Sequence, residues 1–181
     1  MLDYSKNFFE LFGLPQVIPV DTKVLSDRFH ALQQALHPDR YAAAGEREKR
    51  LSMQASTRVN EAYQTLRDPV AGARYLLSLY TRDTAPENKN TKDMGFLMEQ
   101  MALREALAEA KSRPDPYAAV TAVMDRLVAQ SDRLLDQLTE RLNSPNSGNL
   151  EEARELVGKL QFVRKCQGEA EQVEAELDDG L

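Results

Sequence analysis

The chain has 181 residues, of which 42% are hydrophobic and 29% are charged, and its formal net charge is −6 at pH 7. This length and composition predict one or two folded domains and exclude wholesale disorder. No run approaches the roughly 20 apolar residues that a membrane span requires, and the single cysteine, Cys166, excludes an internal disulfide framework and a zinc site built of cysteines.

The charge is distributed unevenly along the chain. Residues 1–80 hold 10 basic and 9 acidic side chains, whereas residues 81–181 hold 13 basic and 20 acidic ones. Nucleic-acid binding is not expected, because a nucleic-acid footprint requires a strongly basic domain. The N-terminal residues carry neither a secretory signal nor a transit-peptide pattern. The lack of such a targeting pattern, together with the presence of only one cysteine, favours a location in the reducing cytoplasm.

The first half of the chain shows helical periodicity and no strand-like alternation. "SKNFFELFGLP" predicts a short helix that ends at Gly13. Asp21 is a predicted N-cap for the next helix. One apolar stripe of that helix comprises Leu25, Phe29, Leu32 and Leu36.

Pro38 disfavours helical geometry at His37 and should end this helix there. A second amphipathic run begins near Glu46, and its apolar face comprises Leu51, Ala55, Val59, Ala62 and Leu66. Two such helices joined by a loop of about nine residues predict an antiparallel hairpin. A shorter helix follows over 68–80, with Pro69 in its first turn.

The polar stretch "TRDTAPENKNTKD" marks a predicted domain boundary. Three long helical runs follow at about 92–112, 115–143 and 149–178, separated by "SRPDP" and "NSPNSGN". Short connections between long helices predict an antiparallel bundle. The sequence therefore predicts an all-α protein with a domain at 1–80, a linker at 81–92 and a three-helix bundle at 93–181.

The loop of the first hairpin contains the tripeptide His37-Pro38-Asp39. Pro38 pre-shapes the loop, Asp39 offers an ionised acceptor, and His37 can donate and accept through opposite ring nitrogens. These properties suit recognition by a partner. The alternative from the residues alone is a helix stop with a capping aspartate.

A catalytic or metal site is not expected in this chain. His30 and His37 are the only histidines, and the distance between them along a helix would be about 10.5 Å. A single zinc ion with bonds of about 2.1 Å cannot bridge that distance. No nucleophile is placed to complete a triad with His37 and Asp39, so no cofactor, metal or enzymatic activity is predicted.

The order "YSKNFFELFGLP … LSDRFHALQQALHPDRYA … NEAYQTLRDPVAGARYLL" resembles a J-domain. In that family His-Pro-Asp lies between the second and third helices and engages a DnaK-type chaperone ATPase. The resemblance implies that His37, Pro38 and Asp39 contact the chaperone. It also implies a basic flank at Lys23, Arg28 and Arg40, although Gln33 and Gln34 occupy neighbouring positions where a further basic group is expected.

"DMGFLMEQMALREALAEAK" predicts a helix with two apolar faces. Phe96, Leu103 and Leu107 form one core stripe. The second sector, about 160° away, comprises Met94, Leu97, Met98 and Met101. That sector is either buried under another segment, as in an inner helix, or exposed as a binding surface.

"FLMEQMALREALAE" and "ARELVGKLQFVRK" resemble the C-terminal domain of HscB, the J-type co-chaperone family of iron–sulfur cluster biogenesis, and the resemblance spans nearly the whole chain. It implies that the J-domain engages the chaperone HscA and that the bundle binds the scaffold protein IscU. The implied scaffold surface is Leu97, Met98, Met101, Glu105, Glu109 and Phe162. Ala102 stands where the family commonly has a carboxylate. Phe162 has an alternative as a core residue, since Leu156, Leu160 and Val163 lie at helical spacings from it.

The resemblance thus implies a bacterial, cytoplasmic co-chaperone that stimulates ATP hydrolysis by HscA and delivers IscU to it. The rival hypothesis is a general J-domain adaptor that holds unfolded clients on its Met-rich helix. It predicts promiscuous binding to unfolded chains, whereas the HscB hypothesis predicts one folded partner.

Overall fold

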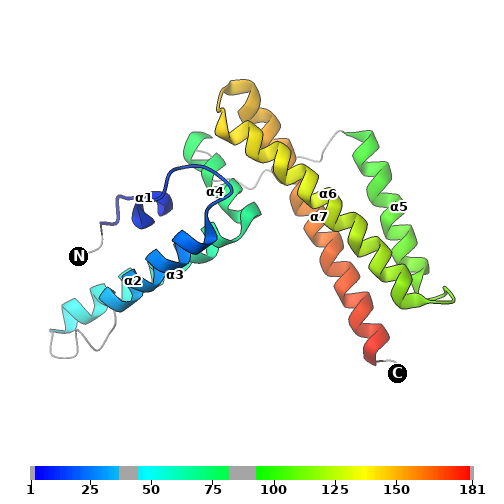
Figure 1. Cartoon of the computed structure of the whole chain (residues 1–181), viewed down its shortest axis with the longest axis horizontal. Helices are drawn as coiled ribbons and strands as arrows, with labels where there is room; N and C mark the ends of the chain where they lie inside the picture. The colour runs from blue at the N-terminus through cyan, green and yellow to red at the C-terminus, as the bar shows by residue number, and fades with distance from the viewer. Residues whose placement is uncertain (1–2, 37–44, 82–92, 180–181) are drawn as a thin grey trace. The chain divides into compact units, whose positions relative to one another are not determined.

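The structure, a computed structural model, describes residues 3–36, 45–81 and 93–179, and every regular element within them is a helix (Figure 1). The helices are α1 (Phe8–Phe12), α2 (Thr22–Leu36), α3 (Glu46–Arg67), α4 (Pro69–Thr81), α5 (Met94–Ala110), α6 (Pro116–Asn143) and α7 (Ser147–Asp179). The all-α prediction is confirmed. The chain forms two compact units, Met1–Arg82 and Asp83–Leu181.

The first unit is built on an antiparallel pair of helices, α2 and α3. The Asp21 carboxylate accepts hydrogen bonds from the Lys23 and Val24 amides at 3.0 Å, which caps α2 as predicted. Farther along the pair, the Phe29 and Tyr63 rings stack with centroids 4.0 Å apart. Leu25 is fully buried, whereas the other members of its apolar stripe, Phe29, Leu32 and Leu36, are half-buried. Among the described residues α2 packs mainly against α3 and the short α1, which cover only part of the stripe.

Helix α1 is short but closed at both ends. Asn7 and Glu10 form a capping box at its start, and Gly13 ends it in the left-handed conformation with φ +60°. Its Phe9 and Phe12 side chains are buried in the unit's core.

Two polar groups outside α1 fix its position against the rest of the unit. The Tyr75 hydroxyl of α4 accepts a hydrogen bond from the Phe8 amide at 2.9 Å, and the two rings stack. Arg58 of α3 donates to the Tyr4 and Lys6 carbonyls and lies over the Phe8 ring.

The second unit is an α6–α7 hairpin with α5 alongside it. Contacts between Arg141 and Glu152 near the turn, and between Tyr117 and Asp178 at the other end, show that α6 and α7 are antiparallel (Figure 1). Helix α7 begins two residues earlier than predicted, because the Asn146 side chain caps it by accepting from the Asn149 amide.

Helix α5 contacts both α6 and α7. It runs parallel to α7, because Arg104 pairs with Glu169 and Lys111 pairs with Glu176 farther along both helices. The core of the unit contains the side chains of Phe96, Leu103, Leu107, Val120, Val123, Leu127, Leu134, Leu138, Leu142, Leu156, Val157, Leu160 and Val163.

One buried polar pair interrupts this apolar core. Gln100 of α5 is 1% exposed and donates through Nε2 to the Gln130 Oε1 of α6 at 2.6 Å. Gln130 in turn donates to Glu99 at 2.7 Å. Within the described residues, Gln100 Oε1 has no hydrogen-bond partner. The cost of burying this unpaired acceptor offsets part of the stability that the Gln100–Gln130 hydrogen bond contributes.

We predict that Gln130→Ala lowers the free energy of unfolding by about 1–3 kcal/mol, because it leaves the buried Gln100 amide without any partner. The double replacement Gln100→Leu/Gln130→Leu should recover most of that loss, since it removes both polar groups together. Urea unfolding followed by circular dichroism measures both values. A double variant less stable than Gln130→Ala would contradict this account.

Candidate functional site

Helix α5 buries one face and leaves the opposite face exposed. Asp93 caps the helix by accepting a hydrogen bond from the Phe96 amide at 3.0 Å. From that start, Phe96, Leu103 and Leu107 turn toward α6 and α7 and are buried. These are the residues that the sequence placed on the core stripe.

The opposite face carries three exposed methionines. Met94, Met98 and Met101 are 68%, 67% and 71% exposed, more than any other large hydrophobic side chain in the described residues, and Leu97 beside them is half-buried. We call these four residues the methionine face. Of the two alternatives that the sequence left open, exposure is the one found. An exposed apolar patch of this kind is typical of a binding surface.

Acidic side chains border the methionine face on the same helix. Glu105 and Glu109 are exposed, and Glu109 accepts a hydrogen bond from Arg113 at 2.8 Å. Ala102, also exposed, contributes only a methyl group beside this acidic border. A partner would therefore meet an apolar stripe with negative charge toward its C-terminal end.

Phe162 of α7 is half-buried. One side of its ring meets Phe96 edge-on at a centroid distance of 6.0 Å, and the Arg104 guanidinium lies 4.8 Å from its centroid. The expected core residues around it, Leu156, Leu160 and Val163, are buried. Phe162 thus belongs partly to the packing of α5 on α7 and partly to the surface.

Sequence reasoning missed the polar contacts that hold α5 on α7. Arg104 forms two hydrogen bonds with the Glu169 carboxylate, at 3.1 and 3.0 Å, and this bidentate geometry orients the guanidinium that lies over Phe162. The pairing joins residues 65 positions apart, so no helical periodicity within one segment reveals it.

A second polar contact holds the start of α5. The Lys159 ammonium donates to Asp93 at 2.7 Å, and this hydrogen bond, with those from the Phe96 and Gly95 amides, lowers the pKa of the Asp93 carboxyl. The Asp93 carboxylate is therefore ionised at neutral pH, and its negative charge interacts favourably with the positive end of the helix dipole.

The loop residues His37, Pro38, Asp39 and Arg40 lie outside the described residues. The structure does describe both stems of that loop: α2 ends at Leu36 and α3 begins at Glu46. Ser52 of α3 donates its hydroxyl to the Leu36 carbonyl at 2.8 Å. The residue immediately before His37 is therefore tied to α3.

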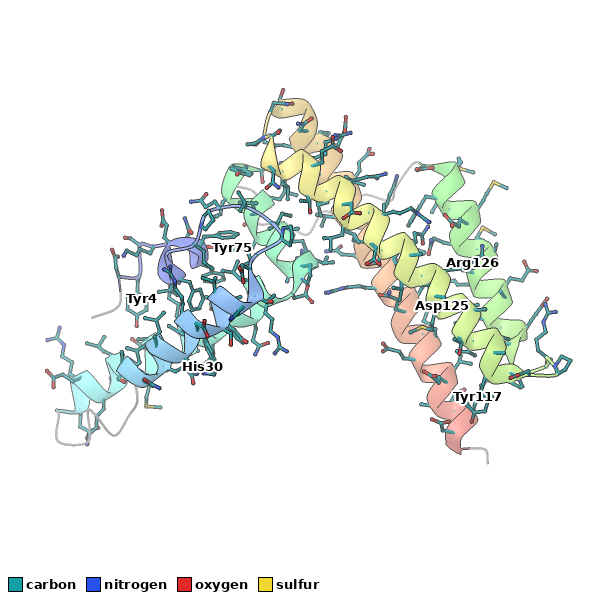
Figure 2. The ribbon with its side chains drawn as sticks, in the orientation of Figure 1. Tyr4, His30, Tyr75, Tyr117, Asp125 and Arg126 are labelled. Carbon is teal, nitrogen blue, oxygen red and sulfur yellow. The ribbon has the colours of Figure 1, made fainter. Side chains whose placement is uncertain are left out.

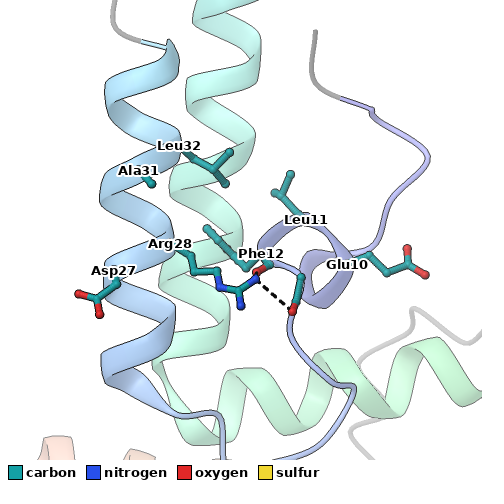
Figure 3. A pocket seen from close by; sticks show the side chains of 8 residues that line it. Glu10, Leu11, Phe12, Asp27, Arg28, Ala31 and Leu32 are labelled. Carbon is teal, nitrogen blue, oxygen red and sulfur yellow. Dashed lines mark hydrogen bonds between the residues drawn. The ribbon is translucent and has the colours of Figure 1, made fainter.

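Arg28, expected on the chaperone-binding flank, holds the end of α1. Its Nη1 donates to the Phe12 and Gly13 carbonyls at 2.9 and 3.3 Å (Figure 3). A side chain at Gly13 would meet this nitrogen, because an added Cβ would lie 2.6 Å from it. Lys23 lies exposed in the first turn of the same helix. Arg28 is also exposed on the surface of α2.

An open groove runs between α1 and α2 beside Arg28 (Figure 3). Leu11, Ala31 and Leu32 line its apolar part, and Glu10 and Asp27 add carboxylates. The groove was not anticipated from the sequence, since it depends on how far α1 covers α2.

His30 and Cys166, the other residues considered for a catalytic or metal site, lie in different units. His30 is exposed on α2 (Figure 2). Cys166 is 2% exposed, and burial raises the pKa of its thiol. The described part of the chain brings no three His, Cys, Asp or Glu side chains together in a way that could hold a metal ion. None of its helices is long and apolar enough to cross a membrane.

Comparison with known proteins gives the class. A family model described as the HSCB C-terminal oligomerisation domain matches residues 92–171. A protein of Shewanella loihica named co-chaperone protein HscB homolog is 40% identical over 94% of this chain and 99% of its own length. The chaperone HscB from Vibrio cholerae, 40% identical, superposes with a TM-score of 0.81 over 95% of this chain and 99% of its own. The human co-chaperone protein HscB, 27% identical, superposes with a TM-score of 0.84 over 95% of this chain and 84% of its own.

These matches place the protein among the helical co-chaperones. It belongs to the HscB family. The resemblance seen in the two sequence motifs is thereby confirmed.

We predict that Arg28→Ala lowers the free energy of unfolding by about 1 kcal/mol, because two carbonyls at the end of α1 lose their donor. Lys23→Ala is the matched control, since it removes the same charge from the same helix without touching α1. Urea unfolding followed by circular dichroism compares the two. Equal stability of the two variants would show that the Arg28 contacts contribute nothing.

Proposed function

We propose that this protein binds the iron–sulfur scaffold IscU through the methionine face and brings it to the DnaK-type chaperone HscA. His37-Pro38-Asp39 then stimulates ATP hydrolysis by HscA, with Lys23, Arg28 and Arg40 as its basic flank. The proposed scaffold surface comprises three residues of that face, Leu97, Met98 and Met101, together with Glu105, Glu109 and Phe162. The protein itself catalyses no reaction in this scheme, which assigns residues 1–80 to the chaperone and 93–181 to the scaffold.

The observation that carries the proposal is the exposure of the methionine face. Met98 and Met101 are about two-thirds exposed although the helix already buries a full stripe on its other side. Exposed apolar side chains gain free energy when a partner removes them from water. Flexible, polarizable methionines can fill an irregular apolar surface on that partner.

The neighbours of this face support a folded partner over an unfolded client. Phe162 is held by Arg104 and Phe96, and Arg104 is itself fixed by two hydrogen bonds to Glu169. A pre-positioned aromatic ring loses little conformational freedom on binding, which favours one complementary surface. The acidic margin at Glu105 and Glu109 suits basic groups on that surface.

The stem of the His-Pro-Asp loop supports the second half of the proposal. Ser52 ties the Leu36 carbonyl to α3, so the chain leaves α2 from a fixed point directly before His37. A loop with a fixed stem and a proline requires less ordering when a chaperone binds it. Stimulation also requires that the two states of HscA bind this loop differently, because otherwise no equilibrium shifts.

One chain that carries both surfaces links the two binding events. Scaffold bound to the second unit is held near the chaperone that the first unit contacts, at an effective concentration set by the connection between the units. We therefore expect this protein and IscU together to stimulate HscA more than the sum of their separate effects.

The scaffold surface is tested by Leu97→Ala/Met98→Ala/Met101→Ala. Loss of three apolar side chains should weaken IscU binding by about a hundredfold, measured by isothermal titration calorimetry. Val128→Ala is the matched control, because Val128 is a 46% exposed apolar residue on α6 outside the methionine face. Tight binding of an unfolded polypeptide that competes with IscU would instead support the general adaptor.

The chaperone surface is tested by His37→Gln in a steady-state ATPase assay with HscA, with and without IscU. We expect the variant to keep its melting temperature and its affinity for IscU while its stimulation of HscA is lost. A lowered melting temperature would instead show that His37 stabilises the fold. Stimulation by the wild type with no response to IscU would retain the J-domain and reject the scaffold assignment.

A further inference from the structure

We propose that Met94, Met98 and Met101 form a peroxide-sensitive site, at which oxidation to methionine sulfoxide reversibly weakens scaffold binding. The inference rests on the proposed function, since it concerns regulation of that same face. It depends on where the sulfur atoms of this protein are exposed.

The thioethers are concentrated on one stripe of one helix. Three of the six methionines of the chain lie at positions i, i+4 and i+7 of α5, which is a single helical face. All three are about two-thirds exposed. Met53 of α3 is 65% exposed but lies in the other unit, and Met124 of α6 is half-buried.

The thiol of the chain does not compete for the oxidant. Cys166 is 2% exposed, and burial raises the pKa of its thiol, so little of the reactive thiolate forms. Peroxide reaching the second unit therefore meets the thioethers of α5 before the thiol.

The reaction balances with a peroxide as the oxidant. The thioether sulfur attacks one peroxide oxygen, an S–O bond forms and the O–O bond breaks. The displaced hydroxide takes the proton from the new sulfur-bound hydroxyl, which leaves the sulfoxide and one water molecule. Sulfur loses two electrons and the peroxide gains them. The product is a polar, chiral sulfoxide in place of an apolar side chain, and methionine sulfoxide reductases reverse the step.

The consequence for binding follows from the position of these sulfurs. A sulfoxide oxygen buried in an apolar interface loses its hydrogen bonds to water, and this cost opposes docking. Oxidation of the free α5 surface, in contrast, leaves Phe96, Leu103 and Leu107 buried as before. Loss of binding without loss of fold is therefore expected.

The first experiment maps the oxidation. The full chain is treated with dilute hydrogen peroxide for increasing times, digested, and analysed by mass spectrometry. Met94, Met98, Met101 and Met53 should gain an oxygen several-fold faster than Met124, in line with their exposure. Oxidation of Met124 at an equal or faster rate would overturn the inference.

The second experiment measures IscU affinity before and after oxidation. Oxidised wild-type protein should bind about tenfold more weakly or worse, and treatment with both sulfoxide reductases should restore its affinity. Met94→Leu/Met98→Leu/Met101→Leu removes the proposed site, and each variant is compared only with its own untreated sample. The triple leucine variant should bind IscU with the same affinity before and after peroxide treatment, whereas Met53→Leu should lose affinity as the wild type does.

The outcomes separate this inference from the proposed function. If untreated wild-type protein does not bind IscU, the proposed function fails and the inference fails with it. If untreated protein binds and fully oxidised protein binds equally well, only the inference fails. An undiminished response in the triple leucine variant also rejects it. If that variant does not fold, restoration of wild-type affinity by the reductases decides the question, since only sulfoxides are reversed by them.

Discussion

The packing of α5 by a single face is the constraint on which the proposed scaffold surface depends. Phe96, Leu103 and Leu107 are drawn inward because burying them against α6 and α7 removes apolar surface from water. A helix is rigid, so fixing that stripe also fixes the direction of every other side chain on it. The exposure of Met94, Met98 and Met101 is the geometric consequence of burying the opposite stripe.

Polar contacts at the edges of this packing fix the orientation of α5 relative to α7. Lys159 holds Asp93 at the start of α5, and Glu169 holds Arg104 in its middle. Both ion pairs are partly exposed, so each contributes little to stability. Their greater effect is on orientation, because a bidentate pair restrains rotation of the helix about its own axis and keeps Arg104 over Phe162. The proposed scaffold surface, which draws on both α5 and α7, requires this restraint.

Much of the fold was predictable from local patterns. Gly13, Asp21 and Pro69 mark helix ends, and the 3.6-residue period identified the core stripes of α3 and α5. The candidate surface was predictable in part, since periodicity alone placed Met94, Leu97, Met98 and Met101 on one face. Whether that face was buried could not be deduced, because an inner helix and an outer helix with an exposed binding surface both carry two apolar faces. The roles of Arg104, Glu169 and Lys159 were not predictable, since their partners lie far away in sequence.

The sequence by itself determined that the chain is helical and where its helices end, and two motifs placed it near the HscB family. These properties depend on backbone preferences and on short spacings, which one segment contains in full. Only the tertiary structure decided that the methionine face is exposed, that Arg28 holds the end of α1 and that Gln100 meets Gln130. Those facts depend on which helices meet and along which faces. That choice follows from the total apolar area buried when all the helices of a unit pack together, which no single segment specifies.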